Sequence, residues 1–393
     1  QIGVPFKVFE TIDELKPLGV GINIQPSAVR ELFDLGLEPY MGKIGVKTYD
    51  YGMYTKTGLE IWTETRGTWA GYYWPQYSVH RGMLHMMLYE QLLERAGPEC
   101  FERGWSATGY ENTATDAILH LQDHDGNNRT EEGDVVIGAD GIHSALRHQI
   151  APDEGPPKWG GFVLWRGTTR MKPFLTGASM VMVGYHSLRF VSYPISEIDP
   201  DTGEALVNWI ATIKYRPEDG YNKEDYNRLA NIDDFLPKFM HWTFDWLNVP
   251  EIVQAADKIY EYPMVDREPL PRWTFDNVTL IGDAAHAAYP VGSNGAGQAI
   301  VDSRVLGASF LEHGVTNAAL QAFEDKMRPA TEKVIYANRG DEGPDAILDV
   351  VEERCGGVFD DIEDVMPYQE LKDHSYKYKK LAGFSIDELN ALP

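Results

Sequence analysis

One continuous stretch constrains the fold of this chain more than any other. It begins with a short apolar run at residues 278–281 and continues into Gly282-Asp283. A glycine-rich loop at residues 292–297 then leads into a helix-like pattern that opens at Gln298. Glycine lets backbone amides approach a ligand closely, and a helix N-terminus favours negative charge. The stretch therefore predicts a cradle for an anionic, polyhydroxylated cofactor, against the plainer interpretation of a strand-turn-helix with a solvated aspartate.

Composition narrows the class of protein. With 393 residues, the chain is long enough for more than one domain and a large core. A formal net charge of −25 argues against nucleic acid and anionic membranes as partners. No apolar stretch reaches the roughly 18 residues needed to span a bilayer, and two cysteines supply neither a disulfide framework nor a thiolate metal site. We expect a cytoplasmic protein without a metal site or a membrane span.

The order of patterns along the chain indicates one α/β domain interrupted by a β-rich domain. Segments that read as strand, loop and helix alternate with aromatic-rich segments that read as antiparallel strands. The strand-loop-helix segments are 1–37, 76–160 and 263–340. The strand-rich segments are 38–75 and 161–262, and a charged helical segment, 341–393, ends the chain. Two sequential domains would not interleave in this way.

Four pieces of the sequence together resemble the FAD-dependent aromatic monooxygenases of the p-hydroxybenzoate hydroxylase fold. These pieces are Glu10 after a strand, Arg81 at a helix start, the motif at 138–147 and the motif at 282–286. The segments that point to the salicylate-hydroxylase-like branch are 17–26, 75–82 and 262–273. The resemblance extends to about residue 340 and implies a Rossmann-like, GR2-type FAD-binding domain for the strand-loop-helix segments. It implies a substrate-binding sheet for the strand-rich ones.

The resemblance implies a role at FAD for each matching polar residue. Glu10 would accept hydrogen bonds from the adenosine ribose, and Arg81 would reach the pyrophosphate or the ribityl chain. Asp283 would hold a ribityl hydroxyl. Asp140 would help to handle the nicotinamide and pyrophosphate, or would be only a structural turn carboxylate. The plainer alternatives are a surface or capping glutamate for Glu10 and a surface ion pair for Arg81.

The glycine-rich loop would lie against the isoalloxazine ring and give backbone amides to its pyrimidine oxygens. Pro290 would sit beside the reacting carbon, whereas His286 is expected to pack structurally. The expected cofactor contacts are Glu10, Gly21, Arg81, Asp140, Asp283, Gly292, Asn294, Gly295 and Ala296.

Substrate contacts are expected from the inserted sheet, because it must cover the flavin ring. Strand alternation allows only about half of each run to face the pocket. Arg166 or Arg189 would pair with a substrate carboxylate, against the plainer interpretation of a structural arginine. The candidates are Trp165, Arg166, Arg189, Tyr193, Asn208 and Trp209. The residues expected to take part in the chemistry are Pro290, Tyr193, Trp209 and Arg166.

The resemblance also implies the chemistry. NADH or NADPH would reduce FAD, and oxygen would give a flavin C4a-hydroperoxide that hydroxylates an aromatic acid or phenol in a closed apolar pocket. The match to the branch implies a fused-ring aromatic acid, with or without loss of its carboxylate. Alternatives are a related epoxidase, halogenase or oxidase, or a degenerate flavin-fold protein that only binds. A homodimer is a further expectation.

One part of the family pattern lies outside the sequence. The family begins with a strand, a Gly-x-Gly-x-x-Gly loop and a helix, whereas this sequence begins at the second strand. We therefore expect the sequence to be incomplete at its N-terminus; a natural lack of this unit would favour the non-catalytic alternative.

Overall fold

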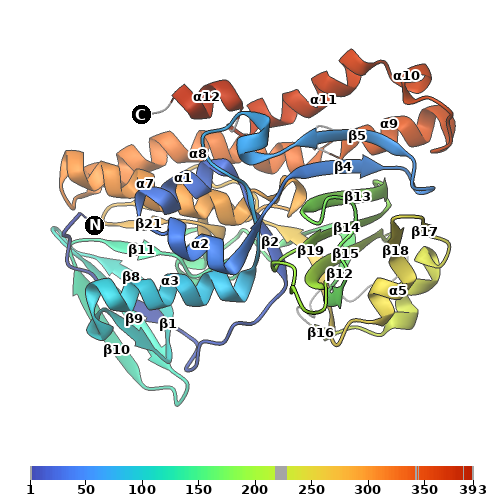
Figure 1. The fold of residues 1–393 in the computed structure, drawn as a ribbon. Coiled ribbons are helices and arrows are strands. Elements are labelled where there is room, and N and C mark those ends of the chain that lie inside the picture. The colour runs from blue at the N-terminus through green and yellow to red at the C-terminus, as the bar shows by residue number, and fades with distance from the viewer. Residues whose placement is uncertain (1, 217–227, 341–342, 344, 384, 392–393) are drawn as a thin grey trace.

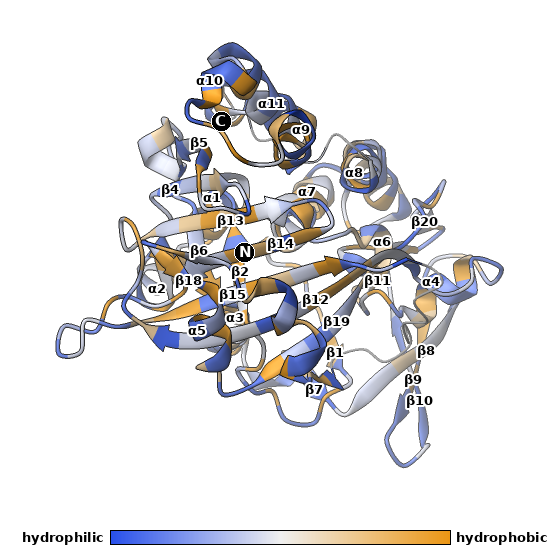
Figure 2. Cartoon of the chain, turned by 90° about the vertical axis from the view of Figure 1, so that its right-hand side faces the viewer, coloured by the Kyte–Doolittle hydropathy of each residue, from blue (hydrophilic) through white to orange (hydrophobic). Residues whose placement is uncertain are grey.

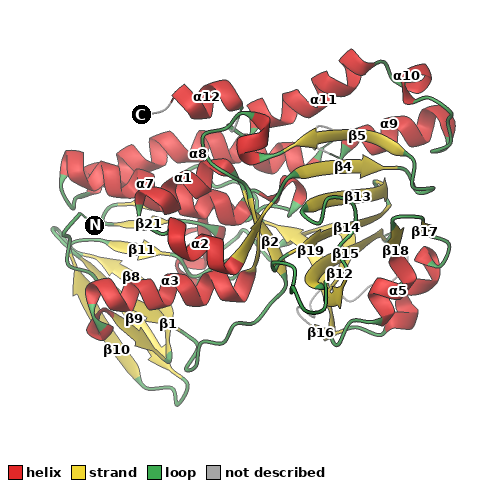
Figure 3. Cartoon of the chain, in the orientation of Figure 1, coloured by secondary structure: helices red, strands yellow, loops and turns green. Residues whose placement is uncertain are grey.

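The structure, a computed structural model, describes residues 2–216, 228–340, 343, 345–383 and 385–391. Strands gather in two regions, with a large sheet on one side and several small sheets on the other (Figure 3). Long helices run across both regions (Figure 1). The predicted α/β fold class is confirmed. No helix in the described ranges is long and apolar enough to cross a membrane.

The large sheet has eight strands and is built from two separate parts of the chain. Its order is β16-β19-β12-β15-β14-β13-β4-β5. The bounds are Arg228–Leu229 (β16), Ile259–Asp266 (β19), Lys158–Met171 (β12), Ala205–Lys214 (β15), Leu188–Pro194 (β14), Ser179–Tyr185 (β13), Asp50–Tyr54 (β4) and Glu60–Thr65 (β5). The neighbours are antiparallel, as predicted, except that β13 and β4 are parallel.

The two faces of this sheet are buried differently. One face packs under the short helices η4 (Ile232–Asp234), η5 (Leu236–Phe239) and α5 (Val249–Gln254), with Phe235 and Phe239 fully buried. The other face packs against the C-terminal helices, through residues such as Leu348 and Met366. Figure 2 shows these helices gathered beside β4 and β5. They are α9 (Ala346–Cys355), α10 (Ile362–Val365), α11 (Tyr368–Leu381) and α12 (Ile386–Ala391).

The strand-loop-helix segments form small sheets flanked by helices. β1 (Val8–Glu10) pairs in parallel with β7 (Phe101–Arg103), and β11 (Val136–Gly138) pairs in parallel with β21 (Val278–Leu280), which also pairs with β20 (Thr274–Phe275). A meander of β8 (Trp105–Asn112), β9 (Ala117–Asp123) and β10 (Asn128–Gly133) lies beyond them. The helices are α1 (Pro26–Asp34), α2 (Glu38–Ile44), α3 (Arg81–Ala96), α4 (Ala145–Ile150), α6 (Asp283–His286), α7 (Gly295–His313) and α8 (Asn317–Arg339).

Residues 38–47 pack differently from the predicted division. β3 (Gly45–Lys47) pairs with β6 (Tyr77–His80), and β6 also pairs with β2 (Gly21–Ile24). Met41 of α2 is fully buried in the core that α1 and α3 share. This segment belongs by packing to the first strand-loop-helix part, so we place the crossing into the large sheet after Lys47 rather than at residue 37.

Candidate functional site

Five of the predicted cofactor residues lie in the turn after β21 and around the loop before α7: Asp283, Gly292, Asn294, Gly295 and Ala296. Asp283 lies three residues after the end of β21 at Leu280, begins α6 and is exposed. The loop bends at Gly292 (φ 76°) and Ser293 (φ 56°), both in the left-handed region, and α7 begins at Gly295. The first N–H groups of a helix have no partner inside it, so this start supplies backbone donors. The motif predicted as a cradle therefore has the local shape expected of one.

A buried histidine-aspartate pair holds the two halves of this motif together. Nε2 of His286 lies 2.6 Å from Oδ2 of Asp302 in α7, and the same oxygen accepts the backbone N–H of Gly282 at 2.8 Å. Both side chains are buried. Burial alone would lower the pKa of His286, yet the carboxylate of Asp302 raises it above its ordinary value. His286 thus packs structurally, as expected, and sequence reasoning missed Asp302.

The motif at 138–147 contacts the turn after β21 through hydrogen bonds to its backbone. Arg147, 1% exposed, donates from Nη1 to the carbonyls of Ala284 at 3.0 Å and Ala285 at 2.8 Å. Asp140 accepts from the backbone N–H groups of Ala145 at 2.8 Å and Leu146 at 3.3 Å. Asp140 therefore caps α4, which is the structural role weighed as its alternative, and its contact with nicotinamide or pyrophosphate stays a prediction.

Gly21 is held from both sides by residues of the large sheet. Its N–H donates to Oδ1 of Asn208 at 2.7 Å, and its carbonyl accepts from Nη2 of Arg166 at 2.7 Å. A Cβ at Gly21 would lie 2.7 Å from Cβ of Asn208, so only glycine allows this approach. The contact joins β2 to strands β12 and β15 and brings predicted cofactor and substrate residues to one place.

Positive charge gathers at this junction. Burial lowers the pKa of the Arg166 guanidinium, and the nearby guanidinium of Arg81 lowers it further, whereas Tyr193 and Tyr262 oppose the shift. Burial raises the pKa of Tyr193 to about 12, so its hydroxyl is protonated at neutral pH. Among the described residues, no carboxylate forms an ion pair with Arg166.

The register of the sheet divides the predicted substrate residues between its two faces. Arg166 lies opposite Ile210, and Asn208 lies opposite Tyr193, so these residues share one face. The same face contacts the chain next to the glycine-rich loop at residues 292–297, called the cofactor loop below, because Leu164 and Met264 pack with Ile210 and Tyr289. This face is the floor of the candidate site.

Trp209 and Trp165 do not join this group. Trp209 is fully buried on the opposite face, stacked 6.0 Å from Phe190, and its Nε1 donates to Oγ1 of Thr169 at 3.1 Å. Trp165 stacks on Phe235 at 4.9 Å on that same face. The predicted role of Trp209 in the chemistry is therefore not supported, since strand alternation turns it away from the neighbouring Asn208.

Arg189 lies on the same face of the sheet as Arg166, but its guanidinium already has an ion-pair partner. It forms a buried ion pair with Asp345, which precedes α9, and its guanidinium lies 5.5 Å from the ring of Phe162. This is the structural arginine weighed as the alternative. Of the two arginines considered for a substrate carboxylate, only Arg166 is left.

Glu10 and Arg81 lie at the ends of their elements, as predicted. Glu10 ends β1, and its Oε1 accepts the N–H of Ile12 at 2.9 Å. Arg81 is the first residue of α3, is exposed, and donates its backbone N–H to Val20 at 2.9 Å. Their contacts with the ribose and the pyrophosphate stay predictions.

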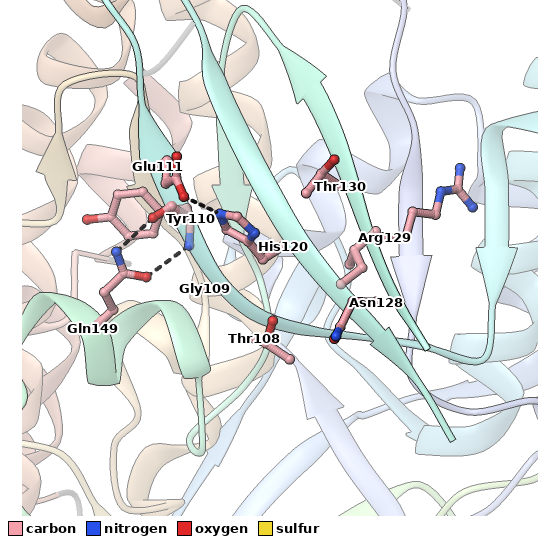
Figure 4. A pocket seen from close by; sticks show the side chains of 10 residues that line it. Thr108, Gly109, Tyr110, Glu111, His120, Asn128, Arg129, Thr130 and Gln149 are labelled. Atoms are coloured by element: carbon pink, nitrogen blue, oxygen red, sulfur yellow. Dashed lines mark hydrogen bonds and ion pairs between the residues drawn. The ribbon is translucent and has the colours of Figure 1, made fainter. Parts of the chain in front are cut away.

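A surface hollow of about 470 Å³ lies elsewhere, in the meander of β8, β9 and β10 (Figure 4). Its edge carries a reciprocal pair of hydrogen bonds between Gln149 and the backbone of Tyr110, at 2.8 and 2.9 Å, and a contact of 3.2 Å between His120 and Glu111. None of its lining residues belongs to the cofactor loop or to the large sheet. It plays no part in the candidate site.

Comparisons with known proteins show which proteins this chain is similar to. The family described as FAD binding domain matches residues 77–337, more than half of the chain. A phenazine 1,6-dicarboxylic acid hydroxylase of Lysobacter antibioticus is 39% identical over 335 residues, covering 84% of this chain and 82% of that protein. A 3-amino-4-hydroxybenzoate 2-monooxygenase of Streptomyces platensis is 29% identical, with coverages of 86% and 82%. HpxO of Klebsiella pneumoniae, solved with FAD and uric acid, has a TM-score of 0.71 at 20% identity and covers 99% of this chain and 91% of its own.

Proposed function

We propose, from the premise that this chain belongs to the FAD-dependent aromatic monooxygenases of the FAD-binding-domain family, that it hydroxylates a fused-ring aromatic acid with NADH or NADPH as reductant. Family membership makes the chain an oxidoreductase with FAD as its cofactor, as its motifs predicted. The substrate class, the carboxylate contact and the reductant are the parts proposed here. The phenazine dicarboxylic acid named for the Lysobacter relative supports a fused-ring acid.

The observation that carries this proposal is the charge of Arg166. It lies on the sheet face that meets the cofactor loop, beside Tyr193, and the part of the chain that the structure describes offers it no carboxylate. A guanidinium binds a carboxylate through paired, charge-assisted hydrogen bonds. We propose that Arg166 takes the substrate carboxylate, while the protonated hydroxyl of Tyr193 donates a second hydrogen bond.

The residues around the cofactor loop fit FAD. Asp283 is exposed at the start of α6, where it would accept from a ribityl hydroxyl, and Arg81 would face the phosphates. The amides that follow Asn294 would meet the pyrimidine edge of the ring, and Pro290, which is exposed, would lie beside its reacting carbon. FAD, once reduced, supplies the oxygen-activating chemistry of the family.

The remaining task of the chain is to orient the ring and exclude water. An apolar cluster lies between Arg166 and the cofactor loop. It contains Leu164, Ile210 and Met264, which pack beside Tyr289. A carboxylate held at Arg166 would place the aromatic ring over this surface. Such a fixed, dry position favours transfer of oxygen to the ring over loss of peroxide.

A substrate screen tests the proposal. FAD-loaded protein is mixed with NADH or NADPH and a series of fused-ring and single-ring aromatic acids, and cofactor oxidation, peroxide and product mass are measured together. We expect fused-ring acids to stimulate oxidation and to yield a product that has gained oxygen, with product mass also reporting whether the carboxylate is lost. Stimulation by no aromatic acid, or release of peroxide alone with all of them, would refute the proposal.

A further inference from the structure

We propose that Tyr378, on the C-terminal helix α11, is a positioning residue that holds the Pro290–Asn294 loop in the shape needed at the flavin ring. The inference rests on the proposed placement of this loop against the ring. It extends the flavin site to a part of the chain for which no cofactor role was predicted.

The hydroxyl of Tyr378 is the centre of a hydrogen-bond network around the loop. It accepts from Nδ2 of Asn294 at 2.6 Å and donates to Oδ1 of Asn338 in α8 at 2.9 Å, with the carbonyl of Val291 as a second acceptor at 3.3 Å. Asn338 in turn donates from Nδ2 to the carbonyl of Tyr289 at 3.0 Å. The loop is therefore held on both sides of Pro290 by two side chains from outside it.

The backbone of the loop needs such support. Ser293 has φ 56°, which a residue with a side chain adopts only at a cost, and Gly292 has φ 76°. Strained backbone persists only where the surroundings fix it. A side chain on Gly292 would collide with the hydroxyl of Tyr378, so this glycine serves both the bend and the approach of α11.

Helix α11 is itself anchored to the large sheet. Glu64 of β5 accepts from Oγ of Ser375 at 2.6 Å and from Nζ of Lys379 at 2.7 Å. Tyr378 is buried at 3% exposure, and burial raises the pKa of its hydroxyl, which keeps the proton it donates. The helix thus connects the sheet proposed to bind substrate with the loop proposed to meet the flavin.

The test compares Tyr378→Phe with Tyr376→Phe, a matched control two residues away at a residue that is 48% exposed. Backbone amide exchange in residues 289–297 is measured with and without FAD, together with the visible absorption spectrum of the bound flavin. Tyr378→Phe leaves Asn294 and Asn338 without their partner, so we expect exchange in this loop to rise by about fivefold to a hundredfold. We also expect a shifted flavin spectrum and more peroxide per NAD(P)H, whereas Tyr376→Phe should change none of these.

Two results would overturn the inference. One is unchanged exchange of the loop in Tyr378→Phe, which would mean that the hydroxyl does not hold it. The other is faster exchange with an unchanged flavin spectrum, which would mean that the loop does not act on the ring. Asn338→Ser keeps the ring of Tyr378 and should reproduce the loop-confined change if Tyr378→Phe is too unstable to measure. A failed proposed function is recognised separately, because the parent protein would then show no oxidation stimulated by aromatic acids.

Discussion

A guanidinium group close to a second positive charge favours the binding of an anion, because the second charge cannot neutralise it. The positive charge of Arg81 lowers the pKa of Arg166, and Arg166 donates a hydrogen bond to the carbonyl of Gly21. The second arginine considered for the substrate, Arg189, is neutralised by Asp345. Arg189 is therefore a structural arginine, whereas the role of Arg166 at a ligand stays a proposal.

Replacing Arg166 tests the carboxylate contact. We expect Arg166→Gln to raise the KM for an aromatic acid by about tenfold to a hundredfold, because a charge-assisted hydrogen bond is lost. The KM for the corresponding phenol without a carboxylate should change much less. Arg170→Gln, an exposed arginine of the same strand, is the control. Equal losses for the acid and the phenol would show that Arg166 only supports Gly21.

Asp302 offers a second test at this scale. In Asp302→Asn, the partner of His286 loses its charge and the N–H of Gly282 loses its carboxylate acceptor. We expect the free energy of unfolding to fall by about 2 kcal/mol, measured by denaturant titration. Glu312→Gln, on an exposed side chain of the same helix, should leave it unchanged. No loss in Asp302→Asn would contradict the structural importance of the pair.

The sequence predicted the residues of local motifs better than those of distant contacts. Asp283 and the loop before α7 follow from neighbours along the chain. The face of Arg166 required the strand register, since alternation alone does not say whether even or odd positions face the pocket. Tyr378 lies 84 positions from Asn294, and no spacing in the sequence signals their contact.

At the scale of elements, one largely buried carboxylate, Glu64, links α11 to β5. Burial by itself would raise the pKa of Glu64, but Arg66 and Lys379 lower it from 4.5 to about 2. The resulting stabilisation is fully present above pH 4.5 and is lost as the pH falls towards 2, because the unfolded chain takes up the proton first. The shift corresponds to roughly 3 kcal/mol.

Acidification should therefore loosen α11. We expect amide exchange in residues 368–381, corrected for its intrinsic dependence on pH, to increase as the pH falls from 4.5. Glu64→Gln should loosen the helix already at neutral pH, whereas Glu60→Gln, an exposed glutamate of the same strand, should behave like the parent. If Glu64→Gln and the parent lose protection over the same acid range, Glu64 does not anchor the helix.

Elements with strong periodic patterns were predicted well, and pairings between distant strands were not. Apolar residues recur at helical spacing within Arg81–Ala96 and Asn317–Arg339, so these helices can be recognised from the sequence alone. The strand at Trp105–Asn112 was not predicted, since its sequence lacks a clear alternation of apolar residues. The parallel pairing of β13 with β4 depends on contacts far apart in the chain, which no local pattern reports.

At the scale of the whole molecule, net charge should influence stability. A formal charge of −25 makes the compact state repel itself, and dissolved salt screens that repulsion. We expect the thermal midpoint of the FAD-loaded protein to rise with NaCl, mostly below about 0.1 M, where the Debye length reaches about 10 Å. KCl at the same ionic strength should give the same rise. A midpoint that falls over this range would mean that favourable ion pairs outweigh the repulsion.

The parallel pairing of β4 with β13 also determines when the large sheet can form during synthesis of the chain. Tyr51 of β4 has its partner at Met180, so β4 and β5 leave the ribosome well before the strand that receives them. Until β13 has been synthesised, the apolar side chains of β4 and β5 have to be protected from water by other contacts. A fragment that covers only residues 158–266 would lack β4 and β5. It would therefore leave one edge of β13 open to pairing with other chains. The large sheet is therefore complete only after both parts of the chain have been synthesised, and the segment 158–266 cannot form all of it alone.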